Sequence, residues 1–208
     1  MNTVLIFDYD GVIVDSLDIF MKLFINACKE NGWKEISSKQ DFLSLFNGNM
    51  YEKMMKLGMK KQDILSIVLQ VKKGLLNNLE KLQLFPKMKQ TLIDLSNQHT
   101  LCISTSNDTS IVKNFLKINQ IFCFDQIYGS DINHSKIKKI DMIKKRYPSD
   151  NYAYIGDTIG DIEEGKKADV ITIAATWGWH SKDKLQQSKP DHLIDSIEDL
   201  PKIASLII

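Results

Sequence analysis

The chain of 208 residues suits one core domain, or a core with a modest insertion, and its 43% hydrophobic and 25% charged residues are ordinary for a globular protein. Its formal net charge of +1 argues against nucleic acid or an acidic membrane as a partner, and no apolar run approaches the length of a membrane span. Three cysteines without metal-like spacing, and no signal-peptide core at the N-terminus, favour a reducing, cytoplasmic location.

The first predicted element is a buried strand over residues 2–7, which form a short apolar run. The strand ends at Asp8-Tyr9-Asp10-Gly11. Gly11 permits a sharp turn there, so we expect the carboxylates of Asp8 and Asp10 to stand above the strand end.

Residues 17–84 show helical periodicity and no convincing strand. A first helix is expected after an N-cap at Ser16, and Gly32 is expected to close it. Three further segments share the helical period, at residues 42–46, 51–57 and 64–82. We therefore predict that residues 17–84 form a small, all-helical inserted domain.

After Pro86, predicted helices and strands alternate along the chain. The expected helices are 86–97, 108–118, 135–147, 161–168 and 196–206. The expected strands are 100–103, 126–128, 152–155 and 170–174, with 192–194 at an edge. This alternation predicts an α/β fold, a Rossmann-like parallel sheet covered on both faces and built from residues 1–16 and 85–208.

Polar side chains follow several of these strands, where the loops of an open parallel sheet form a ligand crevice. They are Asp8 and Asp10, the run Ser104-Thr105-Ser106-Asn107, Lys136, and Asp157 with Asp161. Because these ends meet at one edge, we expect one site with three or four carboxylates, several hydroxyl groups and one ammonium group.

Clustered carboxylates repel one another unless a cation shares them, and oxygen ligands of this kind favour Mg²⁺. Magnesium in turn favours a phosphate group as the substrate. A carboxylate can attack phosphorus to form an acyl phosphate, and an acid two residues along can protonate the leaving oxygen and then activate water. The lysine and hydroxyl groups would stabilise charge on the phosphoryl oxygens.

The first motif of the haloacid dehalogenase superfamily of phosphohydrolases resembles the run Asp8-Tyr9-Asp10-Gly11-Val12-Ile13-Val14-Asp15-Ser16. Its acidic fourth motif is similar to Gly156-Asp157-Thr158-Ile159-Gly160-Asp161. The phosphoglycolate phosphatase-like branch of that superfamily resembles the present chain in two further features. These are the run Thr176-Trp177-Gly178-Trp179 and the helical insertion, which in that branch is a cap domain.

The resemblance implies a role for each polar residue. Asp8 would be the nucleophile and a metal ligand, and Asp10 the general acid/base, with its backbone carbonyl on Mg²⁺. Asp157 would complete the metal site. Ser104 would bind the phosphoryl group, aided by the Thr105 amide.

The family lysine falls at Lys136, which would neutralise the nucleophile and the phosphate, while Asp161 would orient Lys136 or a metal-bound water. In the family this lysine is often followed by proline, whereas here Ile137 follows it, so a shift of the motif to Lys138 or Lys139 stays open. We favour Lys136 because it begins the predicted helix, where the loop still faces the crevice.

One loop of the helical insertion, Phe46-Asn47-Gly48-Asn49-Met50, interrupts the helical period. It resembles the cap loop that reads the leaving group in related phosphatases. Asn47 and Asn49 are therefore candidate substrate-binding residues that would recognise hydroxyl or amide groups, with no cation beside them. A plain helix-to-helix turn is the alternative.

These observations predict an enzyme, a magnesium-dependent phosphatase that acts on small phosphorylated metabolites such as phosphoglycolate, a sugar phosphate or a nucleotide. A phosphomutase of the same fold would share the catalytic residues and stays open as an alternative. A receiver-type signalling domain phosphorylated on aspartate is a second alternative, but its acceptor should end a strand in the region that here reads as helical. A monomer and a homodimer are both compatible with the sequence.

Overall fold

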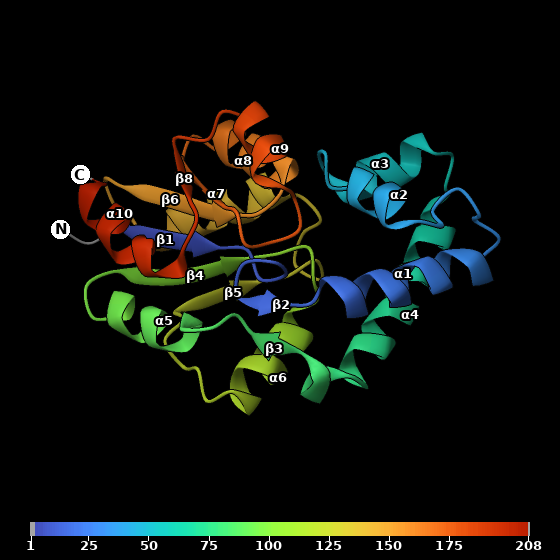
Figure 1. Cartoon of the computed structure of the whole chain (residues 1–208), viewed down its shortest axis with the longest axis horizontal. Helices are drawn as coiled ribbons and strands as arrows, with labels where there is room; N and C mark the ends of the chain where they lie inside the picture. The colour runs from blue at the N-terminus through green and yellow to red at the C-terminus, as the bar shows by residue number, and fades with distance from the viewer. Residues whose placement is uncertain (1–2, 208) are drawn as a thin grey trace.

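The computed structural model describes residues 3–207, and a six-stranded parallel sheet forms its centre (Figure 1). The strands are β1 (Val4–Phe7), β4 (Thr100–Ser104), β5 (Gln126–Tyr128), β6 (Tyr152–Gly156), β7 (Ile171–Ala175) and β8 (His192–Ile194). Their order is β5-β4-β1-β6-β7-β8, so β1 lies inside the sheet, hydrogen-bonded to β4 and β6. Residue 2, the first of the predicted strand, lies outside the described residues.

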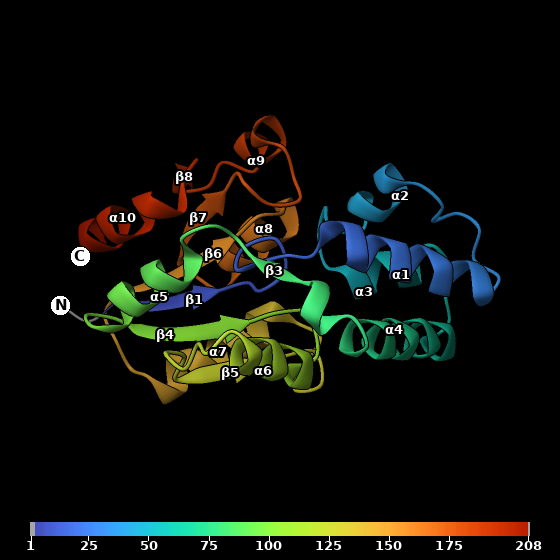
Figure 2. The ribbon, with the colours of Figure 1, turned by 60° about the horizontal axis from the view of Figure 1, so that its bottom comes forward.

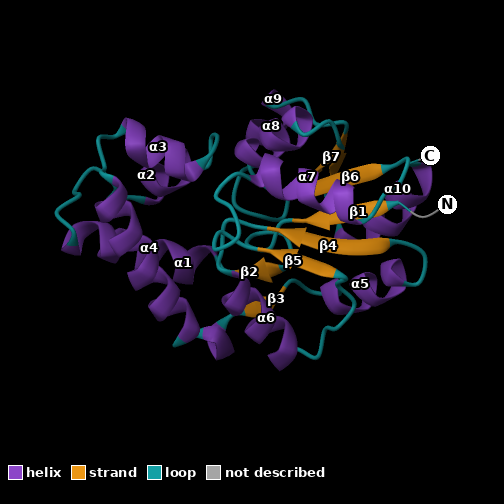
Figure 3. Cartoon of the chain, turned by 180° about the vertical axis from the view of Figure 1, so that it is seen from behind, coloured by secondary structure: helices purple, strands orange, loops and turns teal. Residues whose placement is uncertain are grey.

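Helices cover both faces of the sheet, as Figure 3 shows. They are α5 (Met88–Ser96), α6 (Thr109–Ile118), α7 (Lys136–Arg146), α8 (Ile159–Lys167), α9 (Lys182–Gln187) and α10 (Leu200–Leu206). Side chains of β1 alternate between the faces: Val4 and Ile6 pack with residues of α7, whereas Leu5 and Phe7 pack with residues of α5 and α6. The predicted α/β fold is confirmed; α9 and the short 3₁₀ turn Ile197–Asp199 before α10 were not predicted.

A helical block lies beyond the carboxyl ends of the strands (Figure 2). It contains α1 (Leu17–Glu30), α2 (Lys39–Ser44), α3 (Met50–Lys56), α4 (Lys61–Leu76) and the 3₁₀ turn Leu79–Lys81. The helix predicted over 64–82 was too long, because α4 ends at its C-cap, Asn77. The Asn78 side-chain amide donates to the Gly74 carbonyl and so caps the last turn of the helix.

The chain leaves and re-enters the α/β core through a short two-stranded ribbon. Strand β2 (Val14–Asp15) pairs antiparallel with β3 (Gln83–Leu84). The expectation that residues 17–84 hold no strand was therefore wrong at their last two residues. Such two-residue strands carry too few side chains to show an alternating pattern.

None of the helices within residues 3–207 combines the length and the apolar character needed to cross a membrane.

Candidate active site

Asp8 and Asp10 stand where β1 ends, because the backbone turns sharply at Gly11. Gly11 has a positive φ of 78°, and a Cβ atom there would overlap the carboxylate of Asp157. Only glycine fits this turn without strain. The turn thus lets a residue from the end of β6 approach the end of β1.

The Asp8 carboxylate is buried and is held on both oxygens. Its Oδ1 accepts a hydrogen bond of 2.7 Å from the Tyr9 amide, and its Oδ2 lies 2.7 Å from the Lys136 ammonium. Burial raises the pKa of Asp8 above its ordinary value, while Lys136 acts to lower it. The carboxylate is therefore fixed in one orientation beside a compensating positive charge.

The Asp10 carboxylate lies in a different environment. Its Oδ1 accepts a hydrogen bond of 2.7 Å from the Ser16 hydroxyl, and its Oδ2 accepts one of 2.9 Å from the side-chain amide of Asn107. Burial raises the pKa of Asp10 to about 7, although the Ser16 hydrogen bond acts to lower it. A carboxyl group that titrates near neutral pH can both give and take a proton.

Lys136 is the lysine that the structure brings beside Asp8. Its buried ammonium also pairs with Asp161. Burial acts to lower the pKa of Lys136, but Asp161 and Asp8 raise it well above its ordinary value. Lys138 is exposed. Lys139 is buried and donates a hydrogen bond to the Thr105 carbonyl, so it supports the loop after β4 rather than the carboxylates.

Asp157 and Asp161 come from the end of β6 and the first turn of α8. Thr158 caps this helix in a capping box, with Asp161 as its reciprocal partner. Burial acts to raise the pKa of Asp161, but Lys136 and Thr158 hold it below its ordinary value. Burial, with the nearby charges of Asp161 and Asp8, raises the pKa of Asp157 well above its ordinary value. Within residues 3–207, Lys136 forms ion pairs with Asp161 and Asp8, and Asp157 forms none.

The carboxylates of Asp8, Asp157 and Asp161 fit a divalent cation. One oxygen of each lies within 4.8 Å of the others. Asp157 Oδ2 accepts a hydrogen bond of 2.6 Å from the Trp179 amide, but its buried Oδ1 has no hydrogen-bond partner within residues 3–207. An unpaired buried carboxylate oxygen is costly unless a cation binds it, and an all-oxygen set is what Mg²⁺ prefers.

The loop after β4 differs from the expectation in two details. The Thr105 amide donates to the Tyr128 carbonyl at 3.1 Å, so it is not free to bind a phosphoryl group. The cavity over Asp8 is lined by Thr105, Ser106 and Asn107 but not by Ser104, whose buried hydroxyl has no partner among the described residues. Ser104 follows Cys102 in the strand alternation and so faces the α7 side of the sheet.

Asn47 and Asn49 do not line the cavity that contains Asp8, whereas Phe46 and Met50, at the two ends of the same loop, do. The Asn49 side chain caps α3, and its amide donates to Glu164 at 3.1 Å and to the His134 carbonyl at 3.2 Å. The expectation that no cation lies beside this loop was wrong, because Lys53 lies next to Gly48 and lines a surface cavity with both asparagines.

Several residues of the site were missed from the sequence. Ser16 was interpreted as a helix cap, but its side chain makes no cap hydrogen bond and serves Asp10 instead. His180 accepts from the Ile159 amide at 3.0 Å and contacts the Leu43 carbonyl at 3.2 Å, so it joins the core to α2. A hydroxyl six residues after Asp10 is a usable signal for Ser16, whereas nothing in the local pattern marks His180.

Comparison with known proteins identifies the family of the chain. The model of the haloacid dehalogenase-like hydrolase family matches residues 5–175. A phosphoglycolate phosphatase of Synechococcus elongatus is 24% identical over 201 residues, which cover 94% of each chain. The pyrophosphatase PpaX of Bacillus mycoides is 22% identical over 216 residues, covering 100% of this chain and 98% of that protein.

A solved structure shows the same fold along the whole chain. The crystal structure of a predicted phosphatase from Clostridium acetobutylicum superposes with a TM-score of 0.85 at 18% identity, and the match covers 100% of both chains. The resemblance found in the sequence motifs is thereby confirmed, and the chain belongs to the haloacid dehalogenase-like hydrolase family.

Proposed function

We propose that this protein is a magnesium-dependent phosphatase that hydrolyses small phosphate monoesters through a phosphorylated Asp8. The observation that carries the proposal is the pair of acids at the end of β1. Asp8 is held by Lys136, and Asp10, with a pKa of about 7, lies two residues away in the same cavity. The names of the relatives, phosphoglycolate phosphatase and pyrophosphatase, support phosphoryl chemistry.

In the first half of the reaction, an oxygen of Asp8 attacks phosphorus while the bond from phosphorus to the ester oxygen breaks. Protonated Asp10 gives its proton to that oxygen, so the alcohol leaves as a neutral molecule. The Lys136 ammonium, 2.7 Å from the Asp8 carboxylate, stabilises the charge on the phosphoryl oxygens. Asp161 keeps Lys136 in place through its own ion pair.

In the second half, Asp10 is a carboxylate and takes a proton from a water molecule. The water oxygen attacks phosphorus, the bond to Asp8 breaks, and inorganic phosphate leaves. Asp8 is again a free carboxylate, and Asp10 carries the proton for the next cycle. A pKa of about 7 lets one side chain serve both halves near neutral pH.

Magnesium would be held by the carboxylates of Asp8 and Asp157 and the backbone carbonyl of Asp10, with Asp161 beside them. When bound, it supplies positive charge to the phosphoryl oxygens. The unpaired Oδ1 of Asp157 and the clustering of Asp8, Asp157 and Asp161 support this assignment.

We assign phosphoryl binding to Thr105 rather than to Ser104. Thr105 lines the Asp8 cavity. Its hydroxyl oxygen accepts a hydrogen bond from the backbone amide of Asn107 at 3.1 Å, which leaves the hydroxyl proton free to donate. We also propose that residues 17–84 act as a cap domain, because Phe46 and Met50 of the helical block line the same cavity. The remaining residues, 1–16 and 85–208, would then form the catalytic core.

The test is release of inorganic phosphate from an aryl phosphate and a panel of phosphorylated metabolites, with and without Mg²⁺. The proposal requires magnesium-dependent release that is lost in Asp8→Asn. Conversion of a substrate to an isomeric phosphate without release would favour a phosphomutase instead, and full turnover in excess chelator would contradict the metal assignment.

A further inference from the structure

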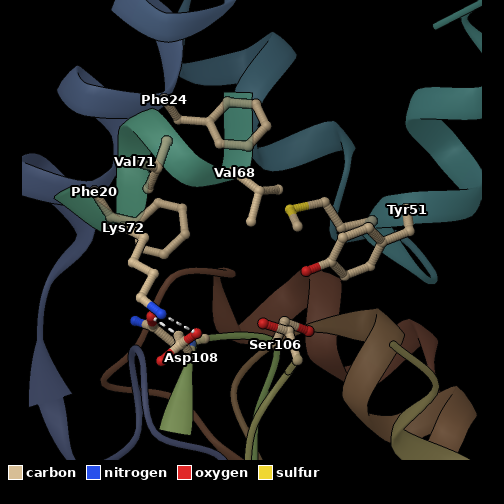
Figure 4. Close-up of a pocket in the computed structure, with 11 residues that line it drawn as sticks. Phe20, Phe24, Tyr51, Val68, Val71, Lys72, Ser106 and Asp108 are labelled. Carbon is tan, nitrogen blue, oxygen red and sulfur yellow. Dashed lines mark hydrogen bonds and ion pairs between the residues drawn. The ribbon is translucent and has the colours of Figure 1, made fainter. Parts of the chain in front are cut away.

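A second cavity adjoins the one over Asp8, between the helical block and the loop after β4 (Figure 4). The two cavities share Phe20, Met50, Ser106 and Asn107, so they adjoin each other. Their volumes are about 30 and about 20 Å³, little more than the room of one water molecule each. A substrate whose phosphoryl group lies at Asp8 would place its alcohol part in this second cavity.

The upper walls of the second cavity are apolar. They are formed by Phe20, Phe24, Val68 and Val71 of α1 and α4, and Met50 of α3 also lines the cavity. Such walls exclude water and strengthen any polar contact made between them. The alcohol part of a substrate would therefore be recognised chiefly by the few polar groups at the end of the cavity.

Two polar groups of the helical block point toward the core loop in Figure 4, the Tyr51 hydroxyl and the Lys72 ammonium. Tyr51 is only 7% exposed, and burial raises the pKa of its hydroxyl while the neighbouring Ser130 side chain acts to lower it. The Lys72 ammonium lies 2.6 Å from the Asp108 carboxylate, and this ion pair uses one of the three donor positions of the ammonium. Two donor positions of Lys72 thus remain for a ligand, and the Tyr51 hydroxyl lies where Ser130 and a ligand can share it.

Negative charge balances or exceeds positive charge at this end of the cavity. Lys72 is the only cation among the residues that line it within 3–207. Burial acts to raise the pKa of Asp108, but Lys72 and Ser110 hold it below its ordinary value, so Asp108 stays ionised. The Asp131 carboxylate is also near enough to act on Tyr51. A carboxylate or a second phosphate would gain little here, because Asp108 offsets the attraction of Lys72.

A hydroxyl group suits this end of the cavity better, because it both donates and accepts. Lys72 and Tyr51 can donate to its oxygen, and Asp108, Ser106 or Ser130 can accept its proton. We infer that this cavity is a leaving-group subsite that selects phosphate esters of small neutral hydroxylated alcohols over esters whose leaving group is anionic. The inference rests on the proposed phosphatase function and narrows its substrate class.

The decisive comparison uses four esters of similar size: hydroxyethyl phosphate, phosphoglycolate, aminoethyl phosphate and propyl phosphate. We expect kcat/KM for hydroxyethyl phosphate to exceed that of each of the others by about tenfold or more, since a site built around a hydroxyl group leaves polar groups unpaired with the wrong ligand. A preference for phosphoglycolate or aminoethyl phosphate would overturn the inference and leave the phosphatase function standing. No magnesium-dependent release from any ester, an aryl phosphate included, would instead defeat the proposed function.

A variant that removes one charge tests the same subsite. Asp108→Asn keeps an N-cap acceptor for α6, where Asp108 accepts from the Ser110 amide at 2.9 Å, and it removes the charge that compensates Lys72. We expect the ratio of kcat/KM for phosphoglycolate to that for hydroxyethyl phosphate to rise by about fivefold in this variant, a modest factor because Lys72 is partly exposed.

Lys72→Met should lower kcat/KM for hydroxyethyl phosphate relative to propyl phosphate, and Tyr51→Phe should do the same. Lys73→Met is the matched control, because Lys73 is the exposed neighbour on α4 and lies outside the lining of this cavity. Unchanged substrate ratios in the Lys72, Tyr51 and Asp108 variants, with thermal unfolding like that of the parent protein, would overturn the subsite.

Discussion

The Lys136 ammonium lies between the carboxylates of Asp8 and Asp161, 2.7 Å from Asp8 Oδ2, and all three side chains are buried. This bridge joins the end of β1 and the first turn of α8 to the first residue of α7. It satisfies two acids and leaves Asp157 to be matched by another positive charge. We thus expect the acids to be divided between one lysine and one bound cation.

Removal of the metal should abolish activity. The cluster of Asp8, Asp157 and Asp161 carries more negative charge than Lys136 balances, so chelation should stop phosphate release and added Mg²⁺ should restore it. Ca²⁺ should bind but inhibit, because its looser and higher coordination would misplace Asp8. Phosphate release in saturating chelator, at the rate seen with Mg²⁺, would refute the metal assignment.

The two acids at the end of β1 should respond differently to the same change. Asp8→Asn should abolish turnover of an aryl phosphate, because an amide is a poor nucleophile. Asp10→Asn should still release one equivalent of the activated phenol and then stall, because nothing takes the proton from water in the second half. Stopped-flow detection of the phenol separates the two outcomes. Equal and mild losses in both variants would contradict the assigned roles.

The rate of the first half should fall as the pH rises through about 7. Burial raises the pKa of Asp10 to that value, and the proton that it gives to the leaving group is lost above it. Single-turnover measurements with an alkyl phosphate, whose alcohol needs that proton, should show the fall. An activated aryl phosphate should show much less of it, and the Asp10→Asn variant should show none. The same pH profile for both esters would count against Asp10 as the acid.

Folding stability without metal should also depend on Asp10. Its pKa is raised in the folded protein, so the folded state binds more protons than the unfolded state between about pH 4 and 7, and the free energy of unfolding should fall as pH rises through that window. Asp10→Asn should weaken this pH dependence, as denaturant titrations at several pH values can measure. An unchanged slope in the variant would contradict the raised pKa.

Lys136 should matter far more than its neighbour Lys138. Lys136→Ala removes the ammonium beside Asp8 and should lower kcat by ~10² or more, whereas Lys138 is exposed and Lys138→Ala should change it little. Because Lys139 supports the Thr105 carbonyl, we expect Lys139→Met to have an effect between the two and to act mainly on KM. A severe Lys138→Ala variant would place the motif two residues further along the chain.

The sequence predicted the convergence of Asp8, Asp157 and Lys136 because parallel strands bring their carboxyl ends to one edge, and this holds whatever the loop details are. It also predicted the alternation of helices and strands, because periodicity reports which face of each element is buried. What it could not predict depends on a single side-chain direction. Whether Ser104 or Thr105 faces the cavity is decided by the strand's alternation, and a shift of one residue reverses the answer.

Contacts between the helical block and the core were also beyond the sequence. Asn49 binding Glu164, and Lys72 pairing with Asp108, join residues 115 and 36 positions apart, and no local pattern marks either pair. The ribbon of β2 and β3 was missed because two residues are too few to show a period. These features concern how the helical block sits on the core, and they are where substrate preference is expected to arise.

We propose that the phosphoryl group passes through Asp8, and identification of the phosphorylated residue is the sharpest test of this step. The Asp10→Asn variant should be mixed with Mg²⁺ and an aryl phosphate, quenched in acid, and its peptides measured by mass spectrometry. We expect one added phosphoryl group on the peptide that contains Asp8, absent from Asp8→Asn and reduced in the presence of chelator. Magnesium-dependent phosphate release with no modification of Asp8, or with the phosphoryl group on another residue, would contradict it.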